Sequence, residues 1–137
     1  MPFTGPTEDR LAIRELLDAY ADAVVRNDAA AWGECWAKDA YWSMPDYPEF
    51  GTPTGRENIV ATWVEAMKHY PGVIFVSNPG SIEVDGDTAK VTAYTSEVYN
   101  DAGGNVKRDR GTYEDTCIRE DGRWVFQRRI FRNIHRG

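Results

Sequence analysis

The chain of 137 residues is long enough for one domain that buries about two-thirds of its unfolded surface around a single core. Its formal net charge of -6 argues against binding to nucleic acid through the phosphates. The two cysteines, Cys35 and Cys117, are far apart and have no histidine cluster nearby, so they indicate neither a metal site nor a disulfide framework. Without a leader or a long apolar run, we expect a single cytoplasmic domain over residues 1–137.

The first predicted element is an amphipathic helix over residues 8–26. Apolar residues between Leu11 and Val25 recur at three- and four-residue intervals, which places them on one stripe of a helix. Thr7 is the expected N-cap, and the two acids that follow it suit the helix dipole. A short second helix is expected over residues 29–36.

Residues 40–44 form a candidate strand. The segment PDYPEFGTPTG that follows is a loop, because three prolines and two glycines exclude a regular element. A third helix is expected over residues 56–69 with Thr54 as its cap. Its buried face is marked at four-residue spacing by Ile59, Trp63 and Met67.

After residue 70 the apolar period changes to two, which is typical of strands. Four long strands are expected, joined by turns that contain Asp-Gly or Gly-Gly, over residues 73–84, 88–99, 106–119 and 124–135. The tripeptide Asn78-Pro79-Gly80 predicts a bulge in the first of them, because proline cannot donate to a strand ladder. The predicted fold class is α+β, with three N-terminal helices on the concave face of a mostly antiparallel sheet.

The order of these elements and several local motifs resemble the SnoaL-like branch of the nuclear transport factor 2-like superfamily. The motifs are YADAVVRND with the short helix AAAWGECW, then TGRENI, SNPGSIEVDGDTAKV and GTYEDTCIREDGRWVFQRR. Together they span nearly the whole chain. The resemblance implies a cone-shaped domain in which a strongly curved sheet encloses a deep apolar pocket. Family members include dehydratases, a dehydrochlorinase, isomerases, cyclases and silent binding modules, so the site has to decide the function.

The resemblance places Asp22 at the position of a catalytic aspartate in the dehydratase and dehydrochlorinase branch. In that branch the aspartate orients a histidine that removes a proton next to a leaving group. In this chain Ile74 stands at the histidine position, with Phe75 beside it. Two roles for Asp22 therefore remain open. It is either a lone acid or base whose pKa an apolar pocket raises toward neutral pH, or a structural acid tied to a tyrosine or an arginine.

The last strand offers a second candidate. Two-residue alternation places two arginines on the same face as large apolar residues, namely Trp124, Phe126, Arg128, Ile130 and Arg132. Arg132 also matches the arginine that holds the leaving group in the dehydrochlorinase branch. An arginine there either stabilises negative charge on a ligand or extends to solvent at the open end of the sheet.

These considerations give the candidate residues. The predicted catalytic set has Asp22 as the acid or base, with polarising roles for Tyr20 and Arg132. The predicted pocket wall consists of Trp42, Met44, Asp46, Ile74, Tyr113 and Phe126. Neither a metal nor a cofactor is expected.

Two functions remain open at the level of sequence. One is a cofactor-free lyase, isomerase or cyclase that acts by acid/base catalysis on a hydrophobic cyclic or aromatic molecule. The other is a non-catalytic small-molecule-binding or assembly module of the same fold. The expected partner is a hydrophobic small molecule, not nucleic acid or a membrane. We also expect a homodimer rather than a trimer, because apolar residues reach the outer face of the sheet at Tyr94, Val98, Thr112 and Ile118.

Overall fold

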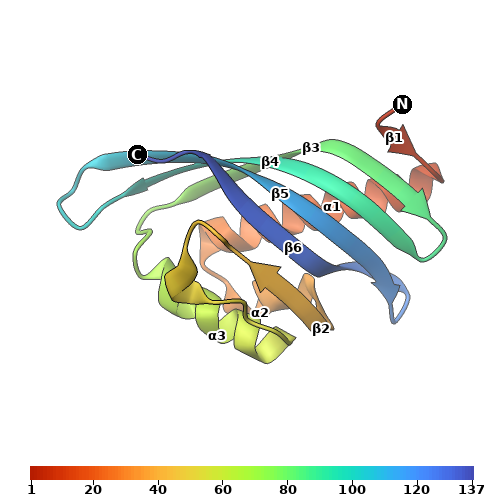
Figure 1. Ribbon diagram of the computed structural model, residues 1–137, viewed down its shortest axis with the longest axis horizontal. Coiled ribbons are helices and arrows are strands. Elements are labelled where there is room, and N and C mark those ends of the chain that lie inside the picture. Colours follow the sequence, from red (N-terminus) through yellow and green to blue (C-terminus); the bar gives the residue numbers. More distant parts are fainter.

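The computed structural model describes residues 1–137 and contains three α-helices and one six-stranded sheet (Figure 1). The helices are α1 (Thr7–Arg26), α2 (Ala29–Glu34) and α3 (Arg56–Met67). The strands are β1 (Phe3–Thr4), β2 (Trp36–Ser43), β3 (Ile74–Asp85), β4 (Thr88–Asn100), β5 (Val106–Glu120) and β6 (Arg123–His135). None of the helices combines the length and the apolar character that a membrane crossing requires.

The sheet has the strand order β1-β3-β4-β5-β6-β2. The strands β3 to β6 form an antiparallel meander, and the two edge strands β1 and β2 pair with it in parallel. Figure 1 shows the four long strands arching over α1, while α2 and α3 lie together with β2 at the lower side of the view. The predicted α+β class, with three helices on a curved and mostly antiparallel sheet, is confirmed.

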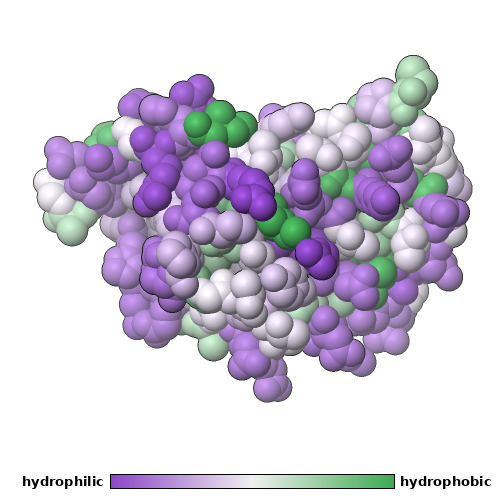
Figure 2. Space-filling view, in the orientation of Figure 1, coloured by the Kyte–Doolittle hydropathy of each residue, from purple (hydrophilic) through white to green (hydrophobic).

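The core lies between α1 and the concave face of the sheet. The helix α1 buries one stripe, which includes Ile13, Leu17, Tyr20 and Val24. Indole stacking joins α2 to α3, since the rings of Trp32 and Trp63 lie 4.6 Å apart with an interplanar angle of 10°. Figure 2 shows that the molecular surface on this side is largely hydrophilic, with separate small apolar areas, as expected when the large apolar side chains are buried.

The predicted bounds of the four long strands agree with the structure to within one residue. Other bounds differ more, because β2 begins at Trp36 instead of residue 40 and α2 ends at Glu34. The bulge predicted in β3 is confirmed by the shift of pairing between Pro79 and Ser81.

Neither predicted hydroxyl caps a helix. Thr7 accepts a hydrogen bond from the side chain of Arg10, and Thr54 donates to a nearby backbone carbonyl, so both capping predictions are wrong. The observed side-chain cap belongs to α2, where Asp28 Oδ1 accepts from the backbone N–H of Ala31 at 3.0 Å. A side-chain cap of this kind contributes about 1 kcal/mol.

A second bulge, in β6, was not predicted. Cys117 of β5 pairs with Phe126, and the preceding Thr116 pairs with Arg128, so Gln127 is an extra residue in the ladder. Side chains alternate with a period of two, so one extra residue exchanges the two faces as far as the next shift of pairing, between Asn133 and His135. Beyond the bulge the inward residues are odd-numbered, and the buried arginine is Arg129.

Candidate functional site

A cavity of about 70 Å³ lies between α1, α3 and the concave face of the sheet. Its wall is mostly apolar or aromatic and comprises Tyr20, Val24, Trp42, Met44, Tyr47, Phe50, Trp63, Ala66, Met67, Tyr70, Val73, Phe75, Glu97, Asp109, Tyr113 and Phe131. Polar groups gather at two places in this wall. The phenol end is defined by Tyr20, Trp42 and Tyr113, and the carboxylate end by Glu97 and Asp109.

The two ends are separated along β5. Asp109 and Tyr113 both face inward from this strand and stand four residues apart, which corresponds to about 13 Å. The phenol end is deeply buried, whereas Glu97 at the carboxylate end is only partly buried. The cavity is therefore an apolar slot with neutral hydrogen-bonding groups at one end and acids at the other.

The phenol end is a short hydrogen-bonded chain. The indole N–H of Trp42 donates to the hydroxyl oxygen of Tyr113 at 3.3 Å, and this oxygen lies 3.4 Å from the hydroxyl oxygen of Tyr20. Burial raises the pKa of both phenols, and the nearby positive charge of Arg129 opposes part of that rise. Both phenols are therefore neutral at pH 7 and able to donate a hydrogen bond.

A buried ion pair lies against the phenol end. Arg129 makes two hydrogen bonds to Asp115, at 2.7 and 3.0 Å, and the two side chains are 1% and 0% exposed. The Arg129 guanidinium also lies 3.6 Å from the ring centroid of Tyr113 and 4.5 Å from that of Tyr20. Burial lowers the pKa of Arg129, but the combined effect of the Asp115 carboxylate and the two phenols outweighs it and leaves the pKa above its ordinary value. The arginine thus stays cationic and polarises the two rings.

The carboxylate end consists of two acids that face each other across the ladder of β4 and β5. Asp109 accepts hydrogen bonds from the hydroxyl of Tyr99 at 3.0 Å and from the backbone N–H of Gly137 at 2.9 Å. The carboxylate of Glu97 has no hydrogen-bond partner and no ion pair. Burial, and then the negative charge of Asp109, raise the pKa of Glu97 to about 7. Glu97 can therefore both accept and release a proton near neutral pH.

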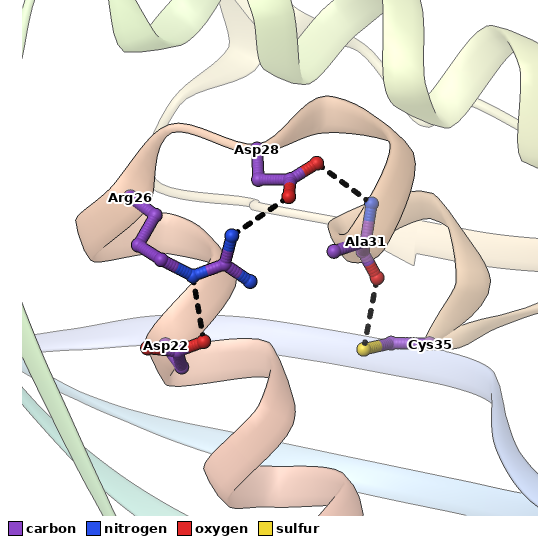
Figure 3. A network of polar contacts seen from close by, with 5 residues as sticks. All are labelled: Asp22, Arg26, Asp28, Ala31 and Cys35. Carbon is purple, nitrogen blue, oxygen red and sulfur yellow. Dashed lines mark hydrogen bonds and ion pairs between the residues drawn. The ribbon is translucent and has the colours of Figure 1, made fainter.

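The prediction that Asp22 faces the pocket is wrong. Its side chain is 62% exposed and pairs with Arg26 at 2.8 Å, and Arg26 in turn pairs with Asp28 (Figure 3). Two residues correspond to about 200° of rotation around a helix, so Asp22 points away from the side that Tyr20 buries. Figure 3 shows the resulting network linking the end of α1 to α2, which is the structural role that the sequence left open.

Two predictions on the strands are wrong for the same reason, the alternation of side chains. Ile74 lies on the outer face and is 52% exposed, while its neighbour Phe75 faces the cavity. Arg132 is exposed because the bulge at Gln127 moves it to the outer face, and Arg129 takes the inward position.

Two further residues are not part of the cavity wall. Asp46 is exposed, and its Oδ2 accepts a hydrogen bond from the backbone N–H of Asn133 at 2.7 Å, which ties its loop to β6. Phe126 is fully buried below the cavity, where its ring packs against Tyr20 at 5.7 Å and against Arg129 at 4.0 Å. The predicted wall residues that do line the cavity are Trp42, Met44 and Tyr113, and the predicted catalytic residue Tyr20 also lines it.

Sequence reasoning missed Glu97, Asp109 and Arg129. Glu97 continues the alternating apolar face of β4, which runs through the buried Val91 and Ala93, so an acid on an apolar face was the available signal. Arg129 carried no such signal, because nothing in its surroundings marks the bulge. The structure contains no group of three or more His, Cys, Asp or Glu side chains that could hold a metal ion.

These features define a class of protein, namely an α+β domain whose helices and curved sheet enclose a small apolar cavity with a few inward polar groups. The family model of the SnoaL-like domain matches residues 6–130, so the chain belongs to this family, within the nuclear transport factor 2-like superfamily. No curated protein sequence matches the chain.

Several solved structures share the fold. A candidate aromatic ring hydroxylase from Novosphingobium aromaticivorans is 24% identical, with a TM-score of 0.85 over 96% of this chain and 93% of that one. A candidate scytalone dehydratase from the same organism is 21% identical, with a TM-score of 0.82 over 96% and 91% of the two chains. A hexachlorocyclohexane dehydrochlorinase from Novosphingobium barchaimii is 21% identical, with a TM-score of 0.80 over 95% and 89%. At these identities the likeness shows the fold alone.

Proposed function

We propose that the protein is a cofactor-free lyase, isomerase or cyclase that acts on a hydrophobic cyclic or aromatic molecule, with Glu97 as its acid and base. The observation that carries the proposal is the state of the Glu97 carboxylate, which faces the cavity without any partner. Every other inward acid is engaged, since Asp115 is bound by Arg129 and Asp109 accepts two hydrogen bonds. A partly buried carboxylate that is free to take up a proton is suited to general acid/base catalysis.

The reaction would begin with removal of a proton from carbon. The Glu97 carboxylate takes a proton from a carbon that is conjugated through the ring with a carbonyl group, and the electron pair of that C–H bond moves along the conjugated bonds to the carbonyl oxygen at the phenol end. A phenol hydrogen from Tyr20 or Tyr113 donates to this oxygen and stabilises the developing negative charge. The proton on Glu97 then goes to another carbon in an isomerisation, or to the leaving group in an elimination.

The names of similar structures support the lyase class. One is a candidate dehydratase and another a dehydrochlorinase, and both names describe the elimination of a small molecule. The phenol end replaces Arg132 of the sequence-based hypothesis as the polarising group, and Glu97 replaces Asp22 as the base.

The size of the cavity limits its ligand. Its volume of about 70 Å³ is less than half of the roughly 150 Å³ of an engineered cavity that holds benzene. A ring-sized ligand therefore enters only when wall side chains move. Met44 and Met67 both line the cavity, and unbranched methionines change rotamer readily, so they are the residues expected to move.

Ring opening of 5-nitrobenzisoxazole tests the base without knowledge of the natural substrate. This uncharged aromatic compound reacts when a base takes its C–H proton, the N–O bond breaks, and a coloured phenolate forms. We expect a rate above that of buffer, rising with pH through about 7, where the Glu97 carboxyl loses its proton. Glu97→Gln should reduce the protein-catalysed rate by about 100-fold or more.

Asp22→Asn is the matched control for this experiment, because it removes an acid from α1 outside the cavity and should leave the rate unchanged. Equal rates for the unmodified protein and Glu97→Gln would contradict the catalytic proposal and favour the binding module of the same fold.

We also propose that the protein is a homodimer formed through the outer face of the sheet. Apolar side chains on the outer face of β3 and β4 are about half exposed, at Ile74 (52%), Val76 (49%) and Tyr94 (50%). A contiguous apolar patch on a protein surface is typical of a site of contact with another protein chain. Light scattering at micromolar concentration should give twice the chain mass of 15.5 kDa, and a monomer mass would refute the dimer.

A further inference from the structure

The phenol end has one hydroxyl hydrogen more than the protein uses. Tyr20 and Tyr113 each bring one, and the 3.4 Å contact between their oxygens uses one of the two. The indole N–H of Trp42 occupies an acceptor position on Tyr113, so it supplies no acceptor for the second hydrogen. That hydrogen is available to an oxygen atom of a ligand.

The phenol end offers no cation to a ligand. Arg129 is the charged group nearest to it, but this arginine lies outside the cavity wall and is bound on two nitrogens by Asp115. An anionic group placed at this end would lose its water and gain only neutral donors, which is unfavourable for a charge.

The carboxylate end is negative and has no compensating cation in the cavity wall. Its two acids come from neighbouring strands, and the other titratable groups around them are neutral phenols whose pKa burial raises, Tyr47, Tyr70 and Tyr99. The basic side chains around this end are exposed and do not line the cavity, since Arg136 stacks on Tyr47 at 4.6 Å and Arg108 and Arg110 flank Asp109 on the outer face of β5. A ligand carboxylate in the slot therefore meets like charge.

We infer that the cavity selects uncharged molecules that carry one hydrogen-bond-accepting oxygen, and that it rejects carboxylates of the same shape. The inference rests on the proposed function, which locates the site in this cavity. It adds the substrate class, a neutral ketone or a related carbonyl compound. It also reverses the expectation from Arg132, which would have favoured anionic ligands.

Two probes of nearly equal shape test this selectivity, the neutral ketone acetophenone and the anion benzoate. Calorimetric titration of the full chain at pH 8 should give a dissociation constant at least about 10-fold lower for acetophenone. Changes in the indole N–H signals of Trp42 and Trp63 in NMR spectra locate the binding, because both rings line the cavity. Removing the like charge with Glu97→Gln should improve benzoate binding about 10-fold and leave acetophenone binding nearly unchanged.

The donor role of the phenol end has its own control. The double variant Tyr20→Phe/Tyr113→Phe should weaken acetophenone binding about 5-fold or more relative to α-methylstyrene, which has the same shape but no oxygen. If this variant does not fold, the inference is tested by the affinities for acetophenone and benzoate, measured in the unmodified protein and in Glu97→Gln. Equal affinities for acetophenone and benzoate, tighter benzoate, or no saturable binding of acetophenone would overturn the inference. Selective binding without ring opening of 5-nitrobenzisoxazole would refute only the catalytic proposal.

Discussion

Arg129→Met is expected to lower the free energy of unfolding by about 3 to 5 kcal/mol, because it leaves the Asp115 carboxylate buried without a partner. The two side chains are 1% and 0% exposed, so water cannot replace the lost hydrogen bonds. The variant also loses the contacts of the guanidinium with the rings of Tyr113 and Phe126, at 3.6 and 4.0 Å. Urea unfolding followed by tryptophan fluorescence measures the effect.

Two further variants separate the ion pair from other causes. Arg128→Met changes the preceding arginine, whose side chain is exposed over the ring of Tyr41, and should cost less than about 1 kcal/mol. The double variant Asp115→Leu/Arg129→Met removes both charges and should regain most of the stability lost by the single variant. A cost for Arg129→Met as small as that for Arg128→Met would show that Asp115 does not depend on its partner.

Glu97→Gln is expected to stabilise the fold above pH 7 by about 3 to 3.5 kcal/mol, which is what a rise of the pKa from 4.5 to about 7 implies at about 1.4 kcal/mol per pH unit. The sign follows from linkage. Below pH 4.5 the carboxyl is protonated in both the folded and the unfolded chain and carries no penalty. Between pH 4.5 and about 7 the unfolded chain ionises more readily, so the native protein loses stability as the pH rises. Above a pH of about 7 the carboxyl is ionised in both states, and the loss of folding stability caused by Glu97 has reached its full size.

Melting temperatures at pH 4.5 and pH 8 test this prediction. Glu97→Gln should match the unmodified protein at the lower pH and exceed it at the higher one. Glu114→Gln is a suitable control, because Glu114 is an exposed acid on the outer face of β5. A lower melting temperature for Glu97→Gln at pH 8 would show that the carboxylate makes a stabilising contact. An acid that destabilises its own fold is typical of a residue retained for function.

Local sequence patterns were sufficient for the elements and their order. The three- and four-residue spacing of apolar residues predicted α1 and α3, and two-residue alternation predicted the four long strands to within one residue. Pro79 predicted the bulge in β3, because a missing N–H has the same consequence in any fold. Four of the predicted site residues line the cavity, namely Tyr20, Trp42, Met44 and Tyr113.

The direction of individual side chains was decided by the tertiary structure. Asp22 lies within an apolar stretch of sequence, yet about 200° of helical rotation separates it from Tyr20 and turns it toward Arg26. The extra residue Gln127 in β6 exchanges the two faces of that strand, so Arg129 is buried and Arg132 is exposed.

The carboxylate end of the cavity depends on pairing between distant residues. Glu97 and Asp109 are 12 positions apart in the chain and meet only because the register of β4 and β5 sets them opposite each other. Their shared burial and like charge, which together raise the pKa of Glu97, exist only after that pairing. The sequence by itself thus determined the elements, which depend on neighbours along the chain. The tertiary structure decided the chemistry of the site, which depends on register, bulges and burial.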